Sequence, residues 1–497
     1  MFLNNANREE AKRLLDLVIN LGLDFKLENR VIQKRTSHKE MFKKFVQPLS
    51  KKGEKLEEII HYFKEDALPY CTNFSTPHFM WFPDAGNSVS GLVWSVLSDF
   101  LQQNLINQSF CAPVATFIEI ATISWLRSIV GYKGWKINDI DDVWGIITGG
   151  WTTSNTIAML LARENYKKWT MIDGVYDKER SYVIIPKWIG HYSIRCSQMR
   201  IWLWFNLLEI ETNNFCYDLN DLEDKLKQYK WKVMALVAYA WDSRTMSVDN
   251  FSSIYTIVKK IDPNIWLHAD ACHGFILGCS QKLKYKIAGI ELFDSITTDP
   301  HKVFNIPYVA SALLLKNPKV VDLISTPSDL ITKEKFSFWQ ITPFIGSKPW
   351  MSLKLWFFMK NVWYDGLEKL IDDRHNIAKL FANKIKKDEN FILLNDVNIN
   401  SVVFMFKWSI PSNLSIDEKI DIMNNINRKI YEYLLEDGMF YLHSFPIPDS
   451  GYLKKWVTLN VLRFMSWNPN LNENMLDAIL NRIKEIWFLL CKNKLCP

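Results

Sequence analysis

Glycine, net charge and long hydrophobic runs are all scarce in this chain of 497 residues. Glycine occurs only 18 times, whereas tryptophan occurs 21 times, which is high for this length. Lys and Arg number 60 against 54 Asp and Glu, and a net charge of +6 is too small to favour nucleic acid or an anionic membrane as a partner. No run approaches ~18 apolar residues, so we expect no membrane-spanning helix. A small molecule is the expected partner.

Cysteine motifs are also absent. The eight cysteines are scattered and form no C-x-x-C pair, so the sequence suggests neither a zinc site nor a disulfide framework. We predict free thiols, no bound metal and a cytoplasmic location. The N-terminal segment agrees with this location, because charged residues interrupt its apolar positions and it lacks the apolar core of a secretory signal.

The composition is otherwise that of a globular protein, with 48% apolar and 23% charged residues. Residues 1–90 are expected to be a helical arm, in which Leu14, Leu15 and Val18 give the first helix an apolar face that needs a partner. Residues 91–365 are expected to form a large α/β domain, and residues 366–497 a smaller α+β domain.

The α/β prediction depends on six nearly continuous apolar runs of strand length, separated by helical segments. Such runs are typical of a mainly parallel sheet that helices cover on both faces. The runs span residues 143–150, 181–188, 233–241, 265–270, 293–300 and 309–316.

Polar residues follow five of these runs where the strands should end. Ligands of open α/β sheets bind at the carboxyl ends of the strands, so we expect these residues to share one site. They are Gly149, Gly150 and Thr152 after the first run, His191 after the second, Ser243 after the third, Asp270 after the fourth, and Asp299, His301 and Lys302 after the fifth.

Asp270 and Lys302 carry most of the chemical information. Asp270 ends an apolar strand, where a buried carboxylate is costly unless it meets a cation or a hydrogen-bond donor. A protonated pyridine nitrogen is such a cation. A single lysine beyond a strand is usually a surface residue, but Lys302 follows the strand next in sequence to that of Asp270.

Four motifs occur here in a consistent order: TGGWTTSN (148–155), HYS (191–193), HADA (268–271) and DPHK (299–302). With them the chain resembles the pyridoxal-phosphate-dependent group II decarboxylases, which include the aromatic L-amino acid, histidine and glutamate decarboxylases. The resemblance extends from about residue 70 to residue 470. It implies a fold-type I enzyme that uses pyridoxal 5'-phosphate (PLP), acts on an amino acid and forms a homodimer.

The resemblance also implies residue roles. Lys302 would be the Schiff-base lysine, Asp270 would pair with the pyridine nitrogen, and His191 would stack on the ring and move protons. The phosphate would sit at the start of the helix near Thr152, where free N–H groups favour an anion. The remaining residues implied to line the cofactor are Gly150, Trp151 (through its backbone), Ser243, Asp299 and His301. We expect Asp299 to act through its backbone or to accept a hydrogen bond from a donor such as His301.

The sequence departs from the family pattern at two turns. Trp151 stands at a glycine or small-residue position of T-S-G-G-T-E-A-N. In AYAWDSRTM, Trp241 and its neighbours replace the small residues of A-T-A-G-T-T-x-x-G. Bulky side chains at such turns could reshape the pocket.

The expected reaction is decarboxylation of an L-amino acid, through an external aldimine and a quinonoid. One alternative is decarboxylation coupled to oxidative deamination, which yields an aldehyde and consumes O2. On a rough alignment Phe336 replaces the tyrosine that protonates the substrate carbon in the aromatic decarboxylases, and loss of that proton donor would favour oxidation. Another alternative is a PLP-binding protein that has lost its activity. His78, Phe82 and Asp84 lie in the segment that resembles the family's substrate-facing arm, and its aromatic side chains suggest an aromatic substrate.

Overall fold

The computed structural model describes most of the chain, and every structural statement below concerns the described residues. These are residues 2–27, 34–48, 51–83, 85–132, 145–174, 182–188, 190–201, 206–325, 345–407 and 413–492.

A seven-stranded sheet forms the centre of the large domain, in the order β1-β9-β8-β7-β6-β2-β3. Strand β9 runs antiparallel to both of its neighbours, and the other pairs in the sheet are parallel. This confirms the mainly parallel sheet predicted from the sequence. The strands are β1 (Gly145–Thr148), β2 (Tyr182–Pro186), β3 (Leu207–Ile210), β6 (Val233–Tyr239), β7 (Trp266–Asp270), β8 (Ser295–Thr298) and β9 (Ser311–Leu315).

Burial explains why these segments are strands. Every residue of β6, β7 and β8 is buried, as expected for central parallel strands covered on both faces. Six of the strands lie within the six predicted runs. Strand β3 was not predicted, because it is only half-buried and has a mixed pattern.

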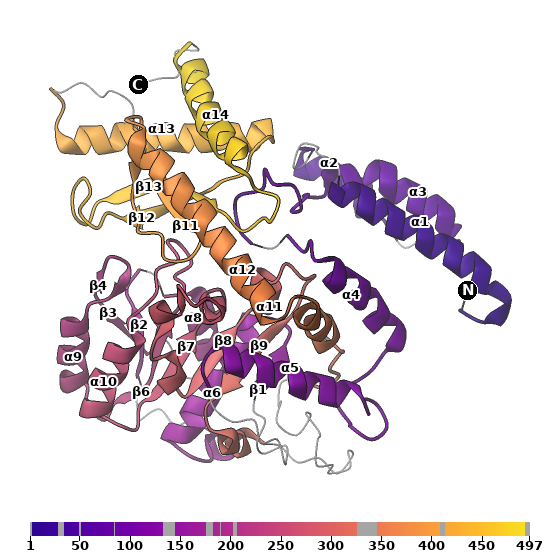
Figure 1. Cartoon of the computed structure of the whole chain (residues 1–497), viewed down its shortest axis with the longest axis horizontal. Helices are drawn as coiled ribbons and strands as arrows, with labels where there is room; N and C mark the ends of the chain where they lie inside the picture. Colours follow the sequence, from indigo (N-terminus) through magenta and orange to yellow (C-terminus); the bar gives the residue numbers. More distant parts are fainter. Residues whose placement is uncertain are drawn as a thin grey trace.

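Helices surround this sheet, and two very short strands form a separate ribbon (Figure 1). The ribbon strands are β4 (Thr212–Asn213) and β5 (Cys216–Tyr217). The helices of this part are α5 (Ala115–Ile129), α6 (Trp151–Tyr166), α7 (Thr170–Asp173), α8 (Tyr192–Arg200), α9 (Leu219–Gln228), α10 (Phe251–Ile261) and α11 (Pro300–Val303), with 3-10 turns at Gly274–Cys279, Lys284–Ile287, Ile290–Leu292 and Pro318–Ile324.

The smaller C-terminal part contains a four-stranded antiparallel sheet in the order β10-β11-β13-β12. Helix α12 (Ser352–Lys387) runs from the large sheet to this smaller one (Figure 1). Helices α13 (Ile416–Asp437) and α14 (Glu473–Lys492) complete it. The predicted smaller α+β unit is therefore confirmed. Its strands are β10 (Phe391–Leu393), β11 (Ser401–Phe406), β12 (His443–Pro448) and β13 (Thr458–Met465).

The N-terminal segment is helical, and its first helices project from the body of the molecule (Figure 1). Leu14 of α1 is buried, but Leu15 and Val18 on the same helix are exposed. The helices are α1 (Arg8–Leu27), α2 (His38–Phe45), α3 (Leu56–Asp66) and α4 (Val89–Leu101), with 3-10 turns at Asn5–Asn7 and Leu68–Tyr70.

The described residues bear on two predictions, one about membrane-spanning helices and one about cysteines. None of the described helices is long and apolar enough to cross a membrane. Six cysteines are free thiols as predicted, but Cys491 is disulfide-bonded, so the prediction of free thiols throughout was wrong. Scattered spacing carries no information on which cysteines the fold brings together.

Candidate active site

Lys302 lies one residue before the end of α11, the short helix that follows β8. Its Nζ atom is 2.8 Å from Oδ2 of Asp299, and both side chains are buried. Ser311 on β9 donates a hydrogen bond to the other carboxylate oxygen of Asp299. His301 instead binds the carbonyl of Ala310 through Nδ1, at 2.8 Å. Asp299 thus accepts a hydrogen bond from a side-chain donor, as expected, but the donor is Ser311 and not His301, whose ring lies toward the start of β9.

Asp270 ends β7, the strand beside β8, and is completely buried. Its Oδ1 atom accepts hydrogen bonds from Trp241 Nε1 at 2.9 Å and from the backbone N–H of Cys272 at 3.3 Å. Its Oδ2 atom accepts one from Asn155 Nδ2 at 3.0 Å. Burial acts to raise the pKa of Asp270, but the nearby His191 and these donors outweigh burial and lower it. The carboxylate is therefore held ionised.

A chain of hydrogen bonds fixes Asn155 against Asp270. Trp266 Nε1 donates to Ser295 Oγ at 2.8 Å, and Ser295 Oγ lies 2.8 Å from His268 Nδ1. His268 Nε2 lies 3.1 Å from Asn155 Oδ1, so this ring nitrogen carries the proton and donates. Burial lowers the pKa of His268 to about 4, which keeps its ring neutral at pH 7. These hydrogen bonds thus orient the two N–H donors of Asn155, one toward Asp270 and the other toward Ser193 Oγ on α8.

His191 is the N-cap residue of α8, just beyond β2. Its Nδ1 atom accepts from the backbone N–H of Ser193 at 3.2 Å, so the ring proton is on Nε2. Its own backbone N–H donates to the Tyr239 hydroxyl at 3.0 Å, which ties the ends of β2 and β6 together. Burial, opposed by the charge of Asp270, lowers the pKa of His191 to about 4. A neutral imidazole therefore lies beside the buried carboxylate.

Helix α6 begins directly after β1 with a turn that leaves backbone N–H groups open. Gly150 is its N-cap residue, has a φ of 136° that favours glycine, and provides no side-chain cap. A Cβ added to Gly149 or Gly150 would meet no atom within 4 Å, so there is open space beside this turn. Thr152 lies in the first turn of the helix. Uncapped N–H groups at a helix N-terminus suit an anion such as a phosphate.

Two indole rings enclose the Lys302 amine. Its Nζ atom lies 3.9 Å from the ring centroid of Trp151 and 4.2 Å from that of Trp241. Since Trp241 also donates to Asp270, its one planar ring contacts both the amine and the carboxylate. The ring of His191 lies near both indoles, with centroids 5.7 Å from Trp151 and 5.8 Å from Trp241.

The structure therefore brings Lys302, Asp270, His191, Asp299, Trp151 and the start of α6 together at one edge of the sheet. Ser243 is near this edge, and its carbonyl accepts from Arg463 on β13, at 2.5 Å. The aromatic segment lies outside this group: the rings of His78 and Phe440 are tilted against each other with centroids 4.7 Å apart, and Phe82 packs on Phe74 and Phe79. Asp84 and Phe336 lie outside the described residues.

Sequence reasoning missed Asn155 and Arg463. Asn155 is the last residue of the TGGWTTSN motif and could have been found from that motif. Arg463 is a buried arginine in an apolar strand, and it also donates to the carbonyl of Trp81, at 3.2 Å. It thus links the aromatic segment to the loop after β6. Burial lowers the pKa of Arg463 to about 10.

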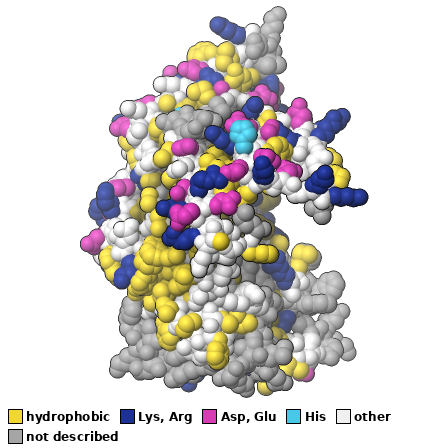
Figure 2. Space-filling view, turned by 90° about the vertical axis from the view of Figure 1, so that its right-hand side faces the viewer, with side chains coloured by type: hydrophobic (Ala, Val, Ile, Leu, Met, Phe, Trp, Pro, Cys, Tyr) yellow, Lys and Arg dark blue, Asp and Glu magenta, His cyan; other side chains and the backbone are white. Residues whose placement is uncertain are grey.

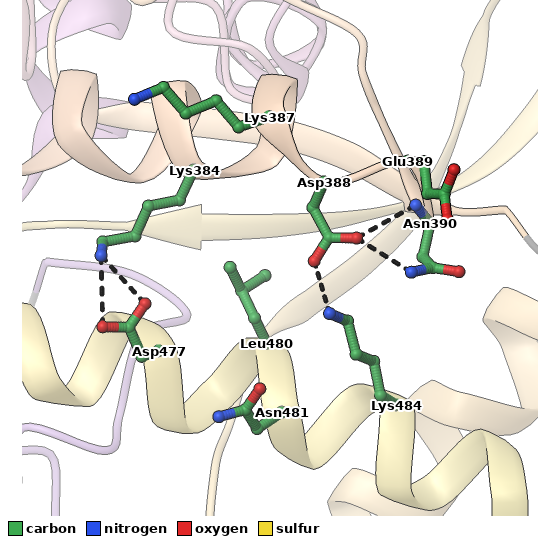
Figure 3. A pocket seen from close by; sticks show the side chains of 9 residues that line it. All are labelled: Lys384, Lys387, Asp388, Glu389, Asn390, Asp477, Leu480, Asn481 and Lys484. Atoms are coloured by element: carbon green, nitrogen blue, oxygen red, sulfur yellow. Dashed lines mark hydrogen bonds and ion pairs between the residues drawn. The ribbon is translucent and has the colours of Figure 1, made fainter.

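A surface hollow of about 620 Å³ lies far from this site, between α12 and α14 of the C-terminal part (Figure 3). Lys384 pairs with Asp477 at 2.9 Å, and Lys484 pairs with Asp388 at 2.5 Å. These side chains are partly exposed and the pairs join two helices across the hollow. The hollow shows surface ion pairing and has none of the buried groups of the sheet edge.

The buried groups fit PLP by their chemistry. Lys302 provides an amine for the aldehyde, Asp270 provides an ionised carboxylate for the ring nitrogen, and the open turn at Gly149 and Gly150 provides N–H groups for the phosphate. One feature conflicts with this fit, because the indole of Trp241 lies on both the amine and the carboxylate.

Comparison with known proteins agrees with this chemistry. An aromatic-L-amino-acid decarboxylase of Bacillus atrophaeus is 23% identical over 96% of this chain and 95% of its own length. Mouse CSAD in apo form superposes with a TM-score of 0.86, at 19% identity over 96% of this chain and 98% of that one. Catharanthus roseus tryptophan decarboxylase in complex with L-tryptophan superposes with a TM-score of 0.82, at 19% identity over 98% and 99% of the two chains. The pyridoxal-dependent decarboxylase conserved domain matches residues 39–407, most of the chain, so this protein belongs to the family of PLP-dependent decarboxylases.

Proposed function

We propose that this enzyme removes the α-carboxylate of an aromatic L-amino acid and releases the amine, with Lys302, Asp270 and His191 as its catalytic residues. One observation carries the proposal: a buried amine and a buried carboxylate lie at neighbouring strand ends, a single planar ring apart. The name of the Bacillus relative and the tryptophan complex of the Catharanthus enzyme support an aromatic substrate.

Each buried group has a task that follows from its surroundings. PLP, when bound, supplies an aldehyde and an electron-poor ring that accepts the electron pair left when CO2 departs. Asp270 would bind the ring nitrogen and keep its proton in place, because the Asn155 side chain and the backbone N–H of Cys272 help to hold the carboxylate ionised. Asp299 pairs with the Lys302 ammonium and fixes its position.

His191 suits proton transfer at the reacting carbon. Its pKa of about 4 leaves the ring neutral at pH 7, and its Nδ1 is occupied by the Ser193 N–H. Nε2–H is the group left to face a ligand. Gly150, Thr152 and the backbone of Trp151 would bind the phosphate at the start of α6, with Ser243 and His301 completing the lining.

The aromatic segment is the proposed substrate-recognition region. Phe74, Phe79, Trp81 and Phe82 form a continuous ring cluster. Arg463 connects Trp81 to the Ser243 loop, so movement of the cluster would be transmitted to the cofactor edge. We propose that His78, Phe82 and Asp84 contact the substrate side chain.

We further propose a homodimer, with the arm of residues 1–90 covering the partner, beside the two domains of residues 91–365 and 366–497. Exposed apolar side chains on α1 and α4 support it, including Val18, Leu23, Val93 and Phe100. Figure 2, which faces the right-hand side of Figure 1, shows hydrophobic side chains gathered on part of this face, below an upper part that is mostly charged. A solution mass of twice 58.4 kDa would support the dimer, and a monomer at micromolar concentration would contradict it. The cytoplasmic location stays a prediction.

A panel of L-amino acids tests the activity, with amine, aldehyde, CO2 and oxygen uptake measured together. We expect an amine and CO2 in equal amounts without oxygen uptake, and loss of both in Lys302→Ala. Aldehyde formed with oxygen uptake would establish the oxidative alternative instead. No product from any amino acid, with PLP bound at Lys302, would show that the protein has lost its activity.

A further inference from the structure

The chain has few glycines and many tryptophans, which suggests that tryptophan stands at positions suited to glycine. Glycine makes up about 7% of an average protein, which is about 35 residues for this length. The chain has 18 glycines and 21 tryptophans. The shortfall of glycine is roughly the size of the tryptophan count.

Backbone φ angles show which tryptophans occupy conformations that favour glycine. Half of the ten described non-glycine residues with positive φ are tryptophan, although bulky residues rarely adopt this conformation and glycine adopts it freely. The φ angles of four of them, between 66° and 73°, are close to those of Gly131, Gly174 and Gly438, which lie between 69° and 79°. The five are Trp169 (70°), Trp188 (68°), Trp231 (66°), Trp363 (47°) and Trp456 (73°).

Trp363 is the most unusual of them. Its φ of 47° and ψ of −166° interrupt helix α12, near a region of backbone conformation that is almost restricted to glycine. Its packing compensates little among the described residues, because the side chain is 54% exposed and its ring makes an edge-to-face contact with Trp125, with centroids 5.6 Å apart. The other four side chains are also more than half exposed and lie at turns or element ends.

Trp266 shows what a well-placed tryptophan looks like in this chain. It lies inside β7, its side chain is 3% exposed, and its indole N–H donates to Ser295. Trp266 therefore differs from the five exposed tryptophans: its indole ring is buried and hydrogen-bonded, whereas at the five positions only the backbone turn is required by the fold.

Trp151 and Trp241 are included for a different reason, since Trp241, like Trp266, is buried and its indole N–H donates a hydrogen bond. The indole of Trp241 lies between the Lys302 amine and the Asp270 carboxylate, which a PLP ring must also join. Trp151 covers the other side of the amine, and its buried indole N–H has no hydrogen-bond partner. Replacing both rings by a hydrogen atom would clear this space.

We propose that positions 151, 169, 188, 231, 241, 363 and 456 carry glycine in the protein made by the source cell, because one codon written here as tryptophan is decoded there as glycine. The codon UGA has this property, since it is a stop signal in the standard code and is read as tryptophan in some bacteria and as glycine in others. The turns then need no strained residue, and the cofactor edge is open. The part concerning positions 151 and 241 rests on the proposed function, whereas the five turns do not.

Peptide mass mapping of the protein purified from its source cells is the direct test. We expect glycine at all seven positions and tryptophan at 266. Tryptophan at the seven positions would overturn the proposal. This readout does not depend on activity, so glycine at 151 and 241 in a protein that fails to bind PLP would contradict the proposed function alone.

Recombinant chains give a second test. A chain with Trp151→Gly and Trp241→Gly should bind PLP at least about tenfold more tightly than the unaltered chain, as measured by titration of the bound cofactor's absorbance. Equal affinity would overturn the proposal for the site. A chain with glycine at the five turn positions should unfold several degrees higher, whereas Trp266→Gly should unfold lower. A lower midpoint for the five-glycine chain would overturn the proposal for the turns.

Discussion

Two lysine–carboxylate pairs of this protein, one at the edge of the large sheet and one at the surface hollow of the C-terminal part, differ clearly in burial. At the sheet edge, the side chains of Lys302 and Asp299 are 6% and 0% exposed. In the hollow, those of Lys384 and Asp477 are 22% and 52% exposed (Figure 3). Burying an ion pair costs free energy that the pair seldom recovers, whereas an exposed pair costs and contributes little. The proposed chemical role of Lys302 depends on its place at the sheet edge with Asp270 and His191, because the pair of Lys348 and Glu119 is equally buried.

Lys302→Ala is the largest expected perturbation of the buried region. Turnover should fall by roughly 10³-fold or more, because the amine that reacts with the cofactor aldehyde is lost. Lys302→Arg is the matched control, since it keeps the charge beside Asp299 but cannot form the same bond. Both variants are assayed in the unaltered chain and in the chain with glycine at 151 and 241. Full activity of Lys302→Arg would contradict the assigned role.

Asp270→Asn should lower turnover by roughly 10²-fold, since a neutral amide cannot hold the proton of the ring nitrogen. It should also destabilise the fold by about 1–3 kcal/mol, because at least one donor among Trp241 and Asn155 loses its acceptor. Urea unfolding measures the second effect. Asp388→Asn in the hollow is the control and should change stability by less than about 1 kcal/mol. Equal effects of the two substitutions would remove the distinction between the regions.

Stability should fall as the pH is lowered from about 6.5 to about 4. His191 and His268 have pKa values of about 4 in the folded chain, so the unfolded chain binds protons in this interval that the folded chain does not. The free energy of unfolding should decrease by roughly 2 kcal/mol or more over this interval. Urea unfolding at several pH values measures the decrease. His268→Gln should flatten the dependence, and the substitution of exposed His61 should not. An unchanged slope in His268→Gln would contradict the buried neutral ring.

Lys484→Met in the hollow should have the smallest effect. Its pair with Asp388 is partly exposed, so the free energy of unfolding should change by less than about 1 kcal/mol, and less still at high salt. Thermal and urea unfolding at two salt concentrations measure this change. A loss of several kcal/mol would show that the hollow is a structural centre comparable to the sheet edge.

Much of the fold and of the site was predictable from the sequence. Continuous apolar runs identified six strands because buried parallel strands have no polar face, and motif order identified Lys302, Asp270 and His191. Strand β3 was missed because it is half-buried. The antiparallel direction of β9 was not predicted, because a short apolar run does not indicate whether a strand lies parallel or antiparallel to its neighbours.

Side-chain packing could not be predicted in the same way. The contact of the Trp241 ring with both Lys302 and Asp270 depends on a rotamer and on the distance between two strand ends. The hydrogen-bond chain through His268 and Asn155 joins residues 113 positions apart. The scarcity of glycine was visible in the composition, but only backbone angles showed which tryptophans occupy glycine conformations.

Chemical trapping of the cofactor tests the central claim most directly. The chain with glycine at 151 and 241 is incubated with PLP, reduced with borohydride, digested and mapped by mass spectrometry. The account predicts that the cofactor is fixed on Lys302, and that Lys302→Ala carries none. Attachment to another lysine, or no attachment, would contradict it.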